Sequence, residues 1–296
     1  MKQQATCYWY IGESMRPWEI AVAGTLARAL IRDGEHLQVF TGGGTESLGI
    51  AGTLSWHSLT AVERSLIVGG KGRLWHLWGE PPSWWKLIRL RARTVHTRFD
   101  ASTAWRGHPT VLSATACSSG ETYIPPAFEM KVNWSPEEEE EVPGDARAPL
   151  FLIAGGDEND DGKFGEIAAE MSSELRNLDD VPDEGGKLLA SGNCILLLPR
   201  PVPSFALLAA YSALMGIPSV AARSALMDEV LGKEGYVHLP SSGSPQEIRD
   251  ALRQVLGEGG RSASAFARRN VTDSFPPEKG AKKLKKLYAS LGGGGV

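Results

Sequence analysis

Short apolar segments alternate with longer amphipathic segments along most of the chain. The short segments, such as Leu37–Thr41 and Cys194–Leu198, are bounded by glycine, proline or polar residues and predict buried strands. The longer segments, such as Glu19–Arg32, place apolar residues at helical spacing on one face. Strands and helices that alternate in this way are typical of parallel sheets covered by helices, so the pattern predicts an α/β protein.

An acidic segment divides this pattern into two parts. Glu137–Glu141 is a run of five carboxylates, which repel one another and stay in water, so we interpret it as part of a linker. At roughly 150 residues per domain, the 296 residues predict two domains, at 1–134 and 149–296, joined by a linker at 135–148. Ligands bind at the carboxyl ends of the strands in open parallel sheets, and clefts between domains are favoured ligand sites.

The two parts differ in charge. Residues 1–134 carry 14 Lys and Arg against 10 Asp and Glu and hold all nine Trp, whereas the remainder carries 17 against 25. The net charge of −4 gives no reason to expect nucleic acid as a partner. Trp84–Arg93 combines cations with aromatic rings. It predicts either contact with an anionic membrane surface or a helix that packs its apolar face on the sheet.

The cysteines and histidines indicate neither a disulfide framework nor a metal site. The three cysteines and six histidines show no spacing typical of metal ligands, so we expect no metal, no cofactor and a reducing, cytoplasmic compartment. Peripheral membrane contact would come through Trp84–Arg93. The uncharged stretch Pro201–Ala222 contains Pro218, which would break a membrane-spanning helix, so we predict a buried helix followed by a strand.

Four loops could bring backbone N–H groups close to a phosphate. They are Gly12–Arg16, Gly42–Gly44, Gly155–Lys163 and Pro199–Phe205. None has the glycine spacing of a known dinucleotide or nucleotide loop, and a plain tight turn remains the alternative for each. The acidic residues between Gly155 and Lys163 would repel phosphate. His76 and His96 each lie near the end of a predicted strand, where they would be either polar groups in the cleft or core histidines.

The second half resembles the donor-site segment of GT-B glycosyltransferases, especially the GT4-like group of retaining enzymes. Ser204-Phe205 and then Ala209–Ala222 (AAYSALMGIPSVAA) are similar to its Glu-Gly-Phe-Gly and Glu-Ala-Met-Ala-x-Gly-x-Pro-Val-Val-Ala pattern. Met227–Val230 resembles the Pro-Glu-Val turn that follows, and Gly232–Pro240 resembles the next loop and strand.

The first half is similar to the same family over shorter segments. These are Gly34–Thr41, Trp75–Gly79, Thr94–His96 and Ile124–Pro126. The order of the segments agrees over nearly the whole chain. The resemblance implies the GT-B fold, with two Rossmann-like domains facing across a cleft, the first for the acceptor and the second for the nucleotide sugar. It also implies that the final helix packs back on the first domain.

Three features depart from the family pattern. Pro203 and Tyr211 stand where the family has two donor-site glutamates, and neither residue supplies a carboxylate. The cations expected to neutralise the donor diphosphate are reduced to Lys163, which has acidic neighbours. The chain is also short between Leu175 and Lys187, where the family has a further strand and helix.

The resemblance implies transfer of a sugar from a nucleotide-diphosphate sugar to an acceptor, with retention of configuration. The residues it implicates are His96 in catalysis, His76 and Arg16 on the acceptor side, and Gly155, Lys163, Arg200, Ser204, Phe205, Tyr211 and Glu229 in donor binding. A basic, Trp-rich first domain suits a hydrophobic or lipid-linked acceptor. Two alternatives remain open: an inactive GT-B-like protein that acts as a binding or partner subunit, and another class of enzyme acting on sugar phosphates or nucleotide sugars.

Overall fold

The structure, a computed structural model, divides into two compact units. Unit 1 comprises Met1–Glu129 and Phe275–Val296, and unit 2 comprises Met130–Ser274. The residues that the structure describes are 7–42, 50–68, 73–80, 93–99, 108–129, 149–156, 158–178, 189, 194–240 and 244–291. The predicted linker at 135–148 therefore lies outside the described residues, as does Trp84–Arg93 except for Arg93.

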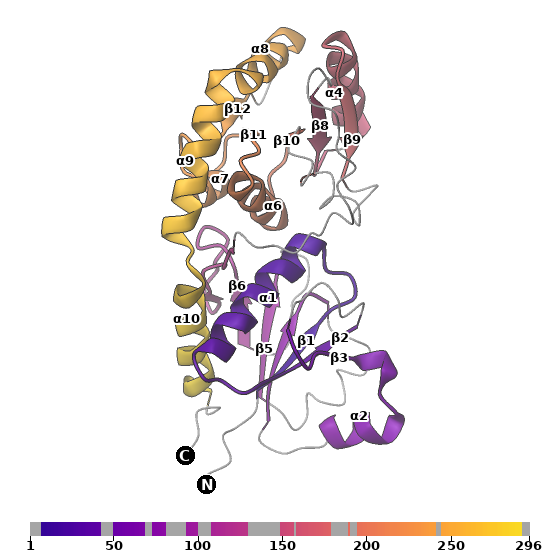
Figure 1. Cartoon of the computed structure of the whole chain (residues 1–296), viewed down its shortest axis with the longest axis vertical. Coiled ribbons are helices and arrows are strands. Elements are labelled where there is room, and N and C mark those ends of the chain that lie inside the picture. The colour runs from indigo at the N-terminus through magenta and orange to yellow at the C-terminus, as the bar shows by residue number, and fades with distance from the viewer. Residues whose placement is uncertain are drawn as a thin grey trace. The chain divides into compact units, whose positions relative to one another are not determined.

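Within its described residues, unit 1 holds a seven-stranded parallel sheet of order β3-β2-β1-β4-β5-β6-β7 (Figure 1). The strands are β1 (Cys7–Ile11), β2 (Leu37–Thr41), β3 (Leu54–Ser55), β4 (Leu74–Trp78), β5 (Arg93–Arg98), β6 (His108–Val111) and β7 (Thr122–Tyr123). The helices are α1 (Pro17–Arg32), the short 3-10 helix η2 (Trp56–Ser58), α2 (Ala61–Val68) and α10 (Pro277–Ser290). Every residue of β4 is buried, as expected for a central strand of a parallel sheet.

The C-terminal helix α10 packs closely on α1. A Cβ atom at Gly280 would lie 2.5 Å from Cδ2 of Leu26 and 2.6 Å from the carbonyl oxygen of Pro125. Only glycine permits this approach. Figure 1 shows α10 running beside α1, so the chain's end completes the unit that its beginning forms.

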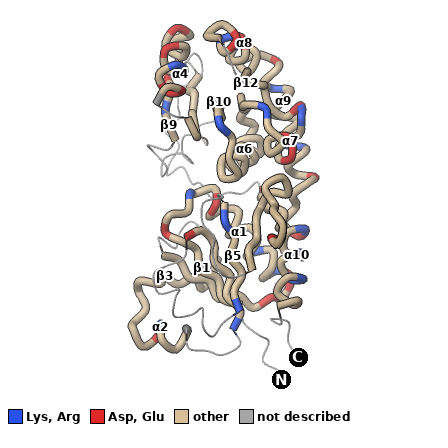
Figure 2. Tube along the Cα trace, turned by 180° about the vertical axis from the view of Figure 1, so that it is seen from behind, with Lys and Arg blue, Asp and Glu red and all other residues tan. Residues whose placement is uncertain are grey.

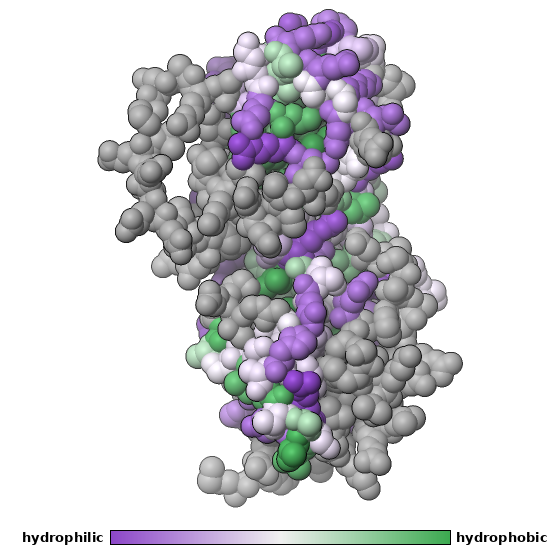
Figure 3. Space-filling model, turned by 90° about the vertical axis from the view of Figure 1, so that its right-hand side faces the viewer, coloured by the Kyte–Doolittle hydropathy of each residue, from purple (hydrophilic) through white to green (hydrophobic). Residues whose placement is uncertain are grey.

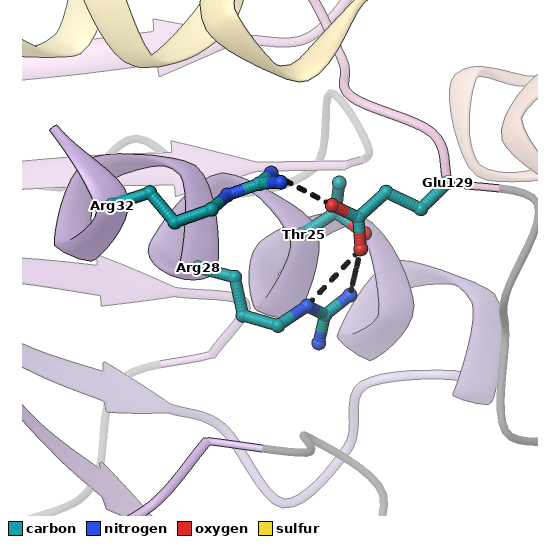
Figure 4. A network of polar contacts seen from close by, with 4 residues as sticks. All are labelled: Thr25, Arg28, Arg32 and Glu129. Atoms are coloured by element: carbon teal, nitrogen blue, oxygen red, sulfur yellow. Dashed lines mark hydrogen bonds and ion pairs between the residues drawn. The ribbon is translucent and has the colours of Figure 1, made fainter.

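Glu129 is the last residue of the first part of unit 1, and its side chain hydrogen-bonds to two arginines of α1 (Figure 4). Its carboxylate accepts from Nε and Nη2 of Arg28, at 3.2 and 3.0 Å, and from Nη2 of Arg32 at 2.8 Å. The neighbouring Phe128 packs edge-on against Phe275, with ring centroids 6.0 Å apart. The points at which the chain leaves and re-enters unit 1 are thus both held within that unit.

Unit 2 holds a five-stranded parallel sheet among its described residues, of order β12-β11-β10-β8-β9. The strands are β8 (Leu150–Ile153), β9 (Glu174–Asn177), β10 (Cys194–Leu198), β11 (Ser219–Ala222) and β12 (Val237–Leu239). The helices are α4 (Glu158–Glu170), α6 (Pro203–Leu214), α7 (Ala225–Val230), α8 (Pro245–Leu256) and α9 (Glu258–Ser274). An apolar core forms where α4 and α8 cover the sheet, and α6 and α9 contact the same strands and each other.

The uncharged stretch Pro201–Ala222 folds as predicted. It forms α6, which is buried all round, and then β11. Gly216 ends the helix with φ +82°, a conformation that glycine adopts without strain. No helix among the described residues is long and apolar enough to cross a membrane. On the side shown in Figure 3, the hydrophobic residues of the described surface form small separate areas between hydrophilic ones.

Candidate functional site

Each unit offers one edge at which the fold favours a ligand. The strand order reverses between β1 and β4 in unit 1 and between β8 and β10 in unit 2. In open parallel sheets, ligands bind outside the carboxyl ends of the strands at such a reversal. The loops after these strands are therefore the candidate sites.

In unit 2, the loop after β8 meets the loop after β10 at Gly155. A Cβ atom at this position would lie 2.7 Å from Cε2 of Phe205 and 3.0 Å from the carbonyl oxygen of Arg200. Gly155 also has φ +74°, which disfavours any other residue. The structure thus brings together three of the predicted donor-site residues, Gly155, Arg200 and Phe205.

Carboxylates from the first turn of α4 modify the charge of this edge (Figure 2). Oδ2 of Asp160 lies 3.2 Å from Nη2 of Arg200, whose side chain is 59% exposed. Oδ2 of Asp161 accepts from Nδ2 of Asn177 at 2.7 Å, whereas its Oδ1 is buried and has no hydrogen-bond partner. An unpaired buried carboxylate oxygen is unfavourable, and it would also repel a phosphate. The cation best placed to hold a diphosphate is therefore already paired with an acid.

The second candidate cation, Lys163, lies on α4 and acts electrostatically on a carboxylate of α8. The pKa of the Glu247 carboxyl on α8 is lowered by hydrogen bonds from the backbone and side chain of Ser244, and the charge of Lys163 lowers it further. Glu229 lies half-buried on α7.

Two predicted donor-site side chains lie in the core of unit 2. Ser204 and Tyr211 are 0% and 1% exposed on α6, which the other elements enclose on all sides. Direct binding of the donor by Ser204 and Tyr211 stays a prediction. In this structure both side chains pack inside unit 2, as does the side chain of Phe205, which is 3% exposed.

In unit 1, the loop after β1 carries an exposed glutamate that contacts a histidine. The N–H of Gly12 donates to the carbonyl of Trp78 at 2.9 Å, and a Cβ atom at Gly12 would lie 2.9 Å from the carbonyl oxygen of Glu80. The next residue, Glu13, places Oε1 2.7 Å from Nε2 of His57, and the two side chains are 58% and 61% exposed. No sequence pattern singled out this pair.

His96 lies on β5 near the same edge. It is 5% exposed, and its Nε2 hydrogen-bonds to the carbonyl oxygen of Gly79, 2.8 Å away in the loop after β4. Burial lowers the pKa of His96, the charge of Arg98 lowers it further, and the hydrogen bond to Gly79 opposes both. His96 is therefore held as a neutral imidazole beside an edge loop.

His76 is a core residue. It is 0% exposed, with Nδ1 2.5 Å from the hydroxyl of Tyr288 and Nε2 2.6 Å from Oγ1 of Thr97. The rings of Trp9 and Trp78 pack against it at 5.0 and 4.5 Å. The acceptor contact of His76 stays a prediction, but the burial of this residue and its position in the middle of β4 favour the alternative of a core histidine.

Arg16 caps α1 at the carboxyl edge of unit 1. Its backbone N–H donates to the Glu19 carboxylate at 2.9 Å, and its guanidinium lies 5.7 Å from the centroid of the Trp18 ring. This position keeps Arg16 a candidate for acceptor binding. Among the described residues, no group of three or more His, Cys, Asp or Glu could hold a metal ion.

Comparisons with known proteins establish the fold. No protein-family model matches the chain, and curated protein sequences give no match. The structure is similar to a glycosyltransferase from Rickettsia africae, with TM-score 0.60 and 12% identity over 98% of this chain and 99% of that one. It is equally similar to Anabaena HepE in complex with UDP-glucose, with TM-score 0.60 and 12% identity over 96% and 99% of the two chains.

A third similar structure is a UDP-N-acetylglucosamine 2-epimerase, with TM-score 0.51 and 9% identity over 98% of this chain and 97% of that one. These matches span both units and both parallel sheets. The chain has the GT-B fold, and the expected α/β class with two Rossmann-like domains is confirmed.

Proposed function

We propose that the protein is a glycosyltransferase that moves a hexose from a nucleotide-diphosphate sugar to an acceptor. The observation that carries the proposal is the contact of Gly155 with Arg200 and Phe205 where the strand order of unit 2 reverses. Of the similar GT-B structures, one is a glycosyltransferase and another contains UDP-glucose.

Unit 2 supplies the donor side in this proposal. The lack of a side chain at Gly155 lets the loop after β8 pack directly against Phe205 and the carbonyl of Arg200, beside the first turn of α6, which favours negative charge. Arg200 would stabilise the charge that develops on the leaving diphosphate, provided that the phosphate displaces Asp160 from it. Lys163 and Glu229 complete the proposed donor side.

Unit 1 supplies the acceptor side, with His96 as one proposed catalytic residue and Arg16 as an acceptor contact. The tryptophans give less support to a hydrophobic acceptor than the sequence suggested. Trp9, Trp18, Trp56, Trp75 and Trp78 are all at most 2% exposed and belong to the core. A lipid-linked acceptor at a membrane surface therefore depends on Trp84–Arg93. Retention of configuration rests on the resemblance to retaining enzymes.

Nucleotide binding provides the test. Thermal unfolding should be followed with a panel of nucleoside diphosphates and nucleotide sugars, and the release of nucleoside diphosphate should be measured with the sugars. A ligand at 100 times its Kd stabilises the protein by about 2.7 kcal/mol. Arg200→Ala should reduce the shift. If no nucleotide at millimolar concentration shifts the transition, the proposal is overturned.

A binding or partner subunit without catalysis is the second candidate. The pairing of Arg200 with Asp160 and the unpartnered Oδ1 of Asp161 favour it, because both oppose diphosphate at this edge. Binding without turnover would support it. The similarity to an epimerase favours the third alternative, another enzyme of nucleotide sugars. Analysis of the sugar product would separate that alternative from transfer.

A further inference from the structure

The Glu13–His57 pair differs from the other histidine contacts that the structure describes. His76, His96 and His108 hydrogen-bond to hydroxyl or carbonyl oxygens. His57 instead contacts a carboxylate, with Nε2 2.7 Å from Oε1 of Glu13, and both side chains are more than half exposed. A solvent-accessible imidazole oriented by a carboxylate is the arrangement that general-base catalysis uses.

The fold makes room for the Glu13 side chain. Glu13 follows β1 directly, and the preceding Gly12 fits tightly against the backbone after β4. A Cβ atom at Gly42, after the neighbouring β2, would lie 2.4 Å from Cγ of Glu13 and 2.5 Å from the hydroxyl of Tyr10. The two glycines therefore place the Glu13 carboxylate at the carboxyl edge, where the strand order of unit 1 reverses.

The backbone at His57 is held in place by its buried neighbour Trp56 and by Arg64. Its neighbour Trp56 is 2% exposed and packs in the apolar cluster that contains Tyr10 and Phe40. Nη2 of Arg64 donates to the carbonyl oxygen of His57 at 3.1 Å, and Nε of Arg64 donates to the carbonyl oxygen of Leu59 at 3.0 Å. The imidazole is thus exposed on a segment whose backbone is held in place.

The contact sets the tautomer of His57. A carboxylate only accepts hydrogen bonds, so the Nε2 that faces Glu13 carries the proton. No described residue hydrogen-bonds to Nδ1, whose lone pair is then available as a base. After Nδ1 takes a proton, the Glu13 carboxylate stabilises the imidazolium.

We propose that His57, oriented by Glu13, is the catalytic base that activates the acceptor hydroxyl; the inference rests on the proposed function. Nδ1 takes the hydroxyl proton while the acceptor oxygen forms a bond to the anomeric carbon. The bond from that carbon to the diphosphate oxygen breaks, and its electron pair leaves with the diphosphate. The proton then passes from His57 to solvent.

A single displacement of this kind inverts the anomeric configuration. Inversion departs from the retention that the family resemblance implies. It accords with the absence of the two donor-site carboxylates of the retaining enzymes, since Pro203 and Tyr211 occupy their positions.

The test uses three variants of the full chain and water as the acceptor. His57→Ala removes the base and Glu13→Gln removes the negative charge. His36→Ala is the matched control, because His36 is an exposed histidine of the same unit that lies just before β2, at the opposite end of the sheet. The substrate is the nucleotide sugar hydrolysed fastest from a panel of UDP-glucose, UDP-N-acetylglucosamine, ADP-glucose and GDP-mannose.

We expect His57→Ala to slow release of the nucleoside diphosphate by about 10²-fold or more, the usual contribution of a general base. Glu13→Gln should have a smaller effect, and His36→Ala should have none. The nucleoside diphosphate of the chosen substrate should shift the melting temperature of every variant as it does that of the unaltered protein, which shows that fold and donor binding are intact. Nuclear magnetic resonance should show that the sugar first released has the configuration opposite to that of the donor.

Retained configuration, or full hydrolysis by His57→Ala, would overturn the inference and leave the proposed function standing. Nucleotide binding without turnover by the unaltered protein would overturn the inference and support the binding-subunit alternative. If the unaltered protein neither binds nor hydrolyses any member of the panel, the proposed function fails together with the inference.

Discussion

The hydroxyl oxygen of Tyr288 lies 2.5 Å from Nδ1 of His76, although 212 residues separate them in the sequence. Both side chains are buried, so the contact ties the C-terminal helix α10 to the strand β4. Nε2 of His76 hydrogen-bonds to the hydroxyl of Thr97, and that hydroxyl lies 2.5 Å from the hydroxyl of Thr110. A buried polar chain is stable only when each member has its partner, so α10 is an integral part of unit 1.

Tyr288→Phe should destabilise unit 1. The substitution leaves Nδ1 of His76 buried without a partner, which costs about 1–3 kcal/mol. Urea unfolding followed by Trp fluorescence reports mainly on unit 1, because eight of the nine Trp lie within residues 1–129. Tyr236→Phe removes a hydroxyl bound to Asp228 in unit 2 and should leave the fluorescence transition unchanged. Equal midpoints for Tyr288→Phe and the unaltered protein would contradict the prediction.

Unit 1 should lose stability in mild acid. Burial, and to a smaller extent the charge of His96, hold the pKa of His76 well below its usual 6.5. The unfolded chain therefore takes up a proton as the pH falls through 6.5, whereas the folded chain does not. The free energy of unfolding has its full value above that pH. At lower pH it decreases by up to about 1.4 kcal/mol per pH unit for each such proton. Burial lowers the pKa of His96 too, so His96 adds to the loss of unfolding free energy as the pH falls.

Urea unfolding at a series of pH values checks this slope. His76→Gln cannot titrate, so it should start from a lower stability but lose less of it between neutral pH and about pH 5. A variant with the same pH dependence as the unaltered protein would show that another group is responsible.

The sequence predicts the two parallel sheets because their central strands are continuous apolar segments. Pro201–Ala222 was predicted correctly for the same reason, as its composition and its glycine and proline leave one arrangement. The edge strand β9 was missed. Its sequence, Glu-Leu-Arg-Asn, has no strong strand pattern, and it becomes a strand by pairing with β8. Tertiary hydrogen bonds there outweigh local preference.

The sequence predicts the proximity of candidate-site residues only where local sequence determines position. Gly155, Arg200 and Phe205 follow adjacent strands, so the topology alone brings them together. The sequence left open whether His76 is a cleft or a core histidine, because its burial depends on Tyr288, which no local pattern connects to it. The sequence did not indicate the contact between Glu13 and His57 for the same reason, since the two residues are 44 apart in the sequence.

Gly155→Ala should destabilise unit 2 and weaken nucleotide binding. The added Cβ would meet Phe205 at 2.7 Å in a backbone with φ +74°, and backbone strain of this kind alone costs about 1–3 kcal/mol. Gly162→Ala is the matched control on α4, because a Cβ there meets no atom within 4 Å. It should be neutral or stabilising by up to about 1 kcal/mol. Urea unfolding followed by circular dichroism, with and without UDP, distinguishes the two. Equal behaviour would show that the loop after β8 adjusts freely.

Asp160→Asn should strengthen binding of a nucleoside diphosphate, and Arg200→Ala should weaken it. The pair is partly exposed, with Nη2 of Arg200 3.2 Å from Oδ2 of Asp160, so the pair itself contributes at most about 1 kcal/mol to stability. Neutralising Asp160 removes its ion pair with the guanidinium and also removes a charge that repels phosphate. We expect changes of about three- to tenfold in Kd, measured by calorimetry at low salt, where exposed charges are least screened.

The double variant decides how Asp160 acts. If its carboxylate weakens phosphate binding by occupying Arg200, then Asp160→Asn should give little gain once Arg200 is alanine, and the two effects should not add. If the effects add in full, Asp160 repels the phosphate directly and independently of Arg200. If neither single variant changes Kd, the diphosphate does not bind at the edge formed by Gly155, Arg200 and Phe205, and the donor site lies elsewhere.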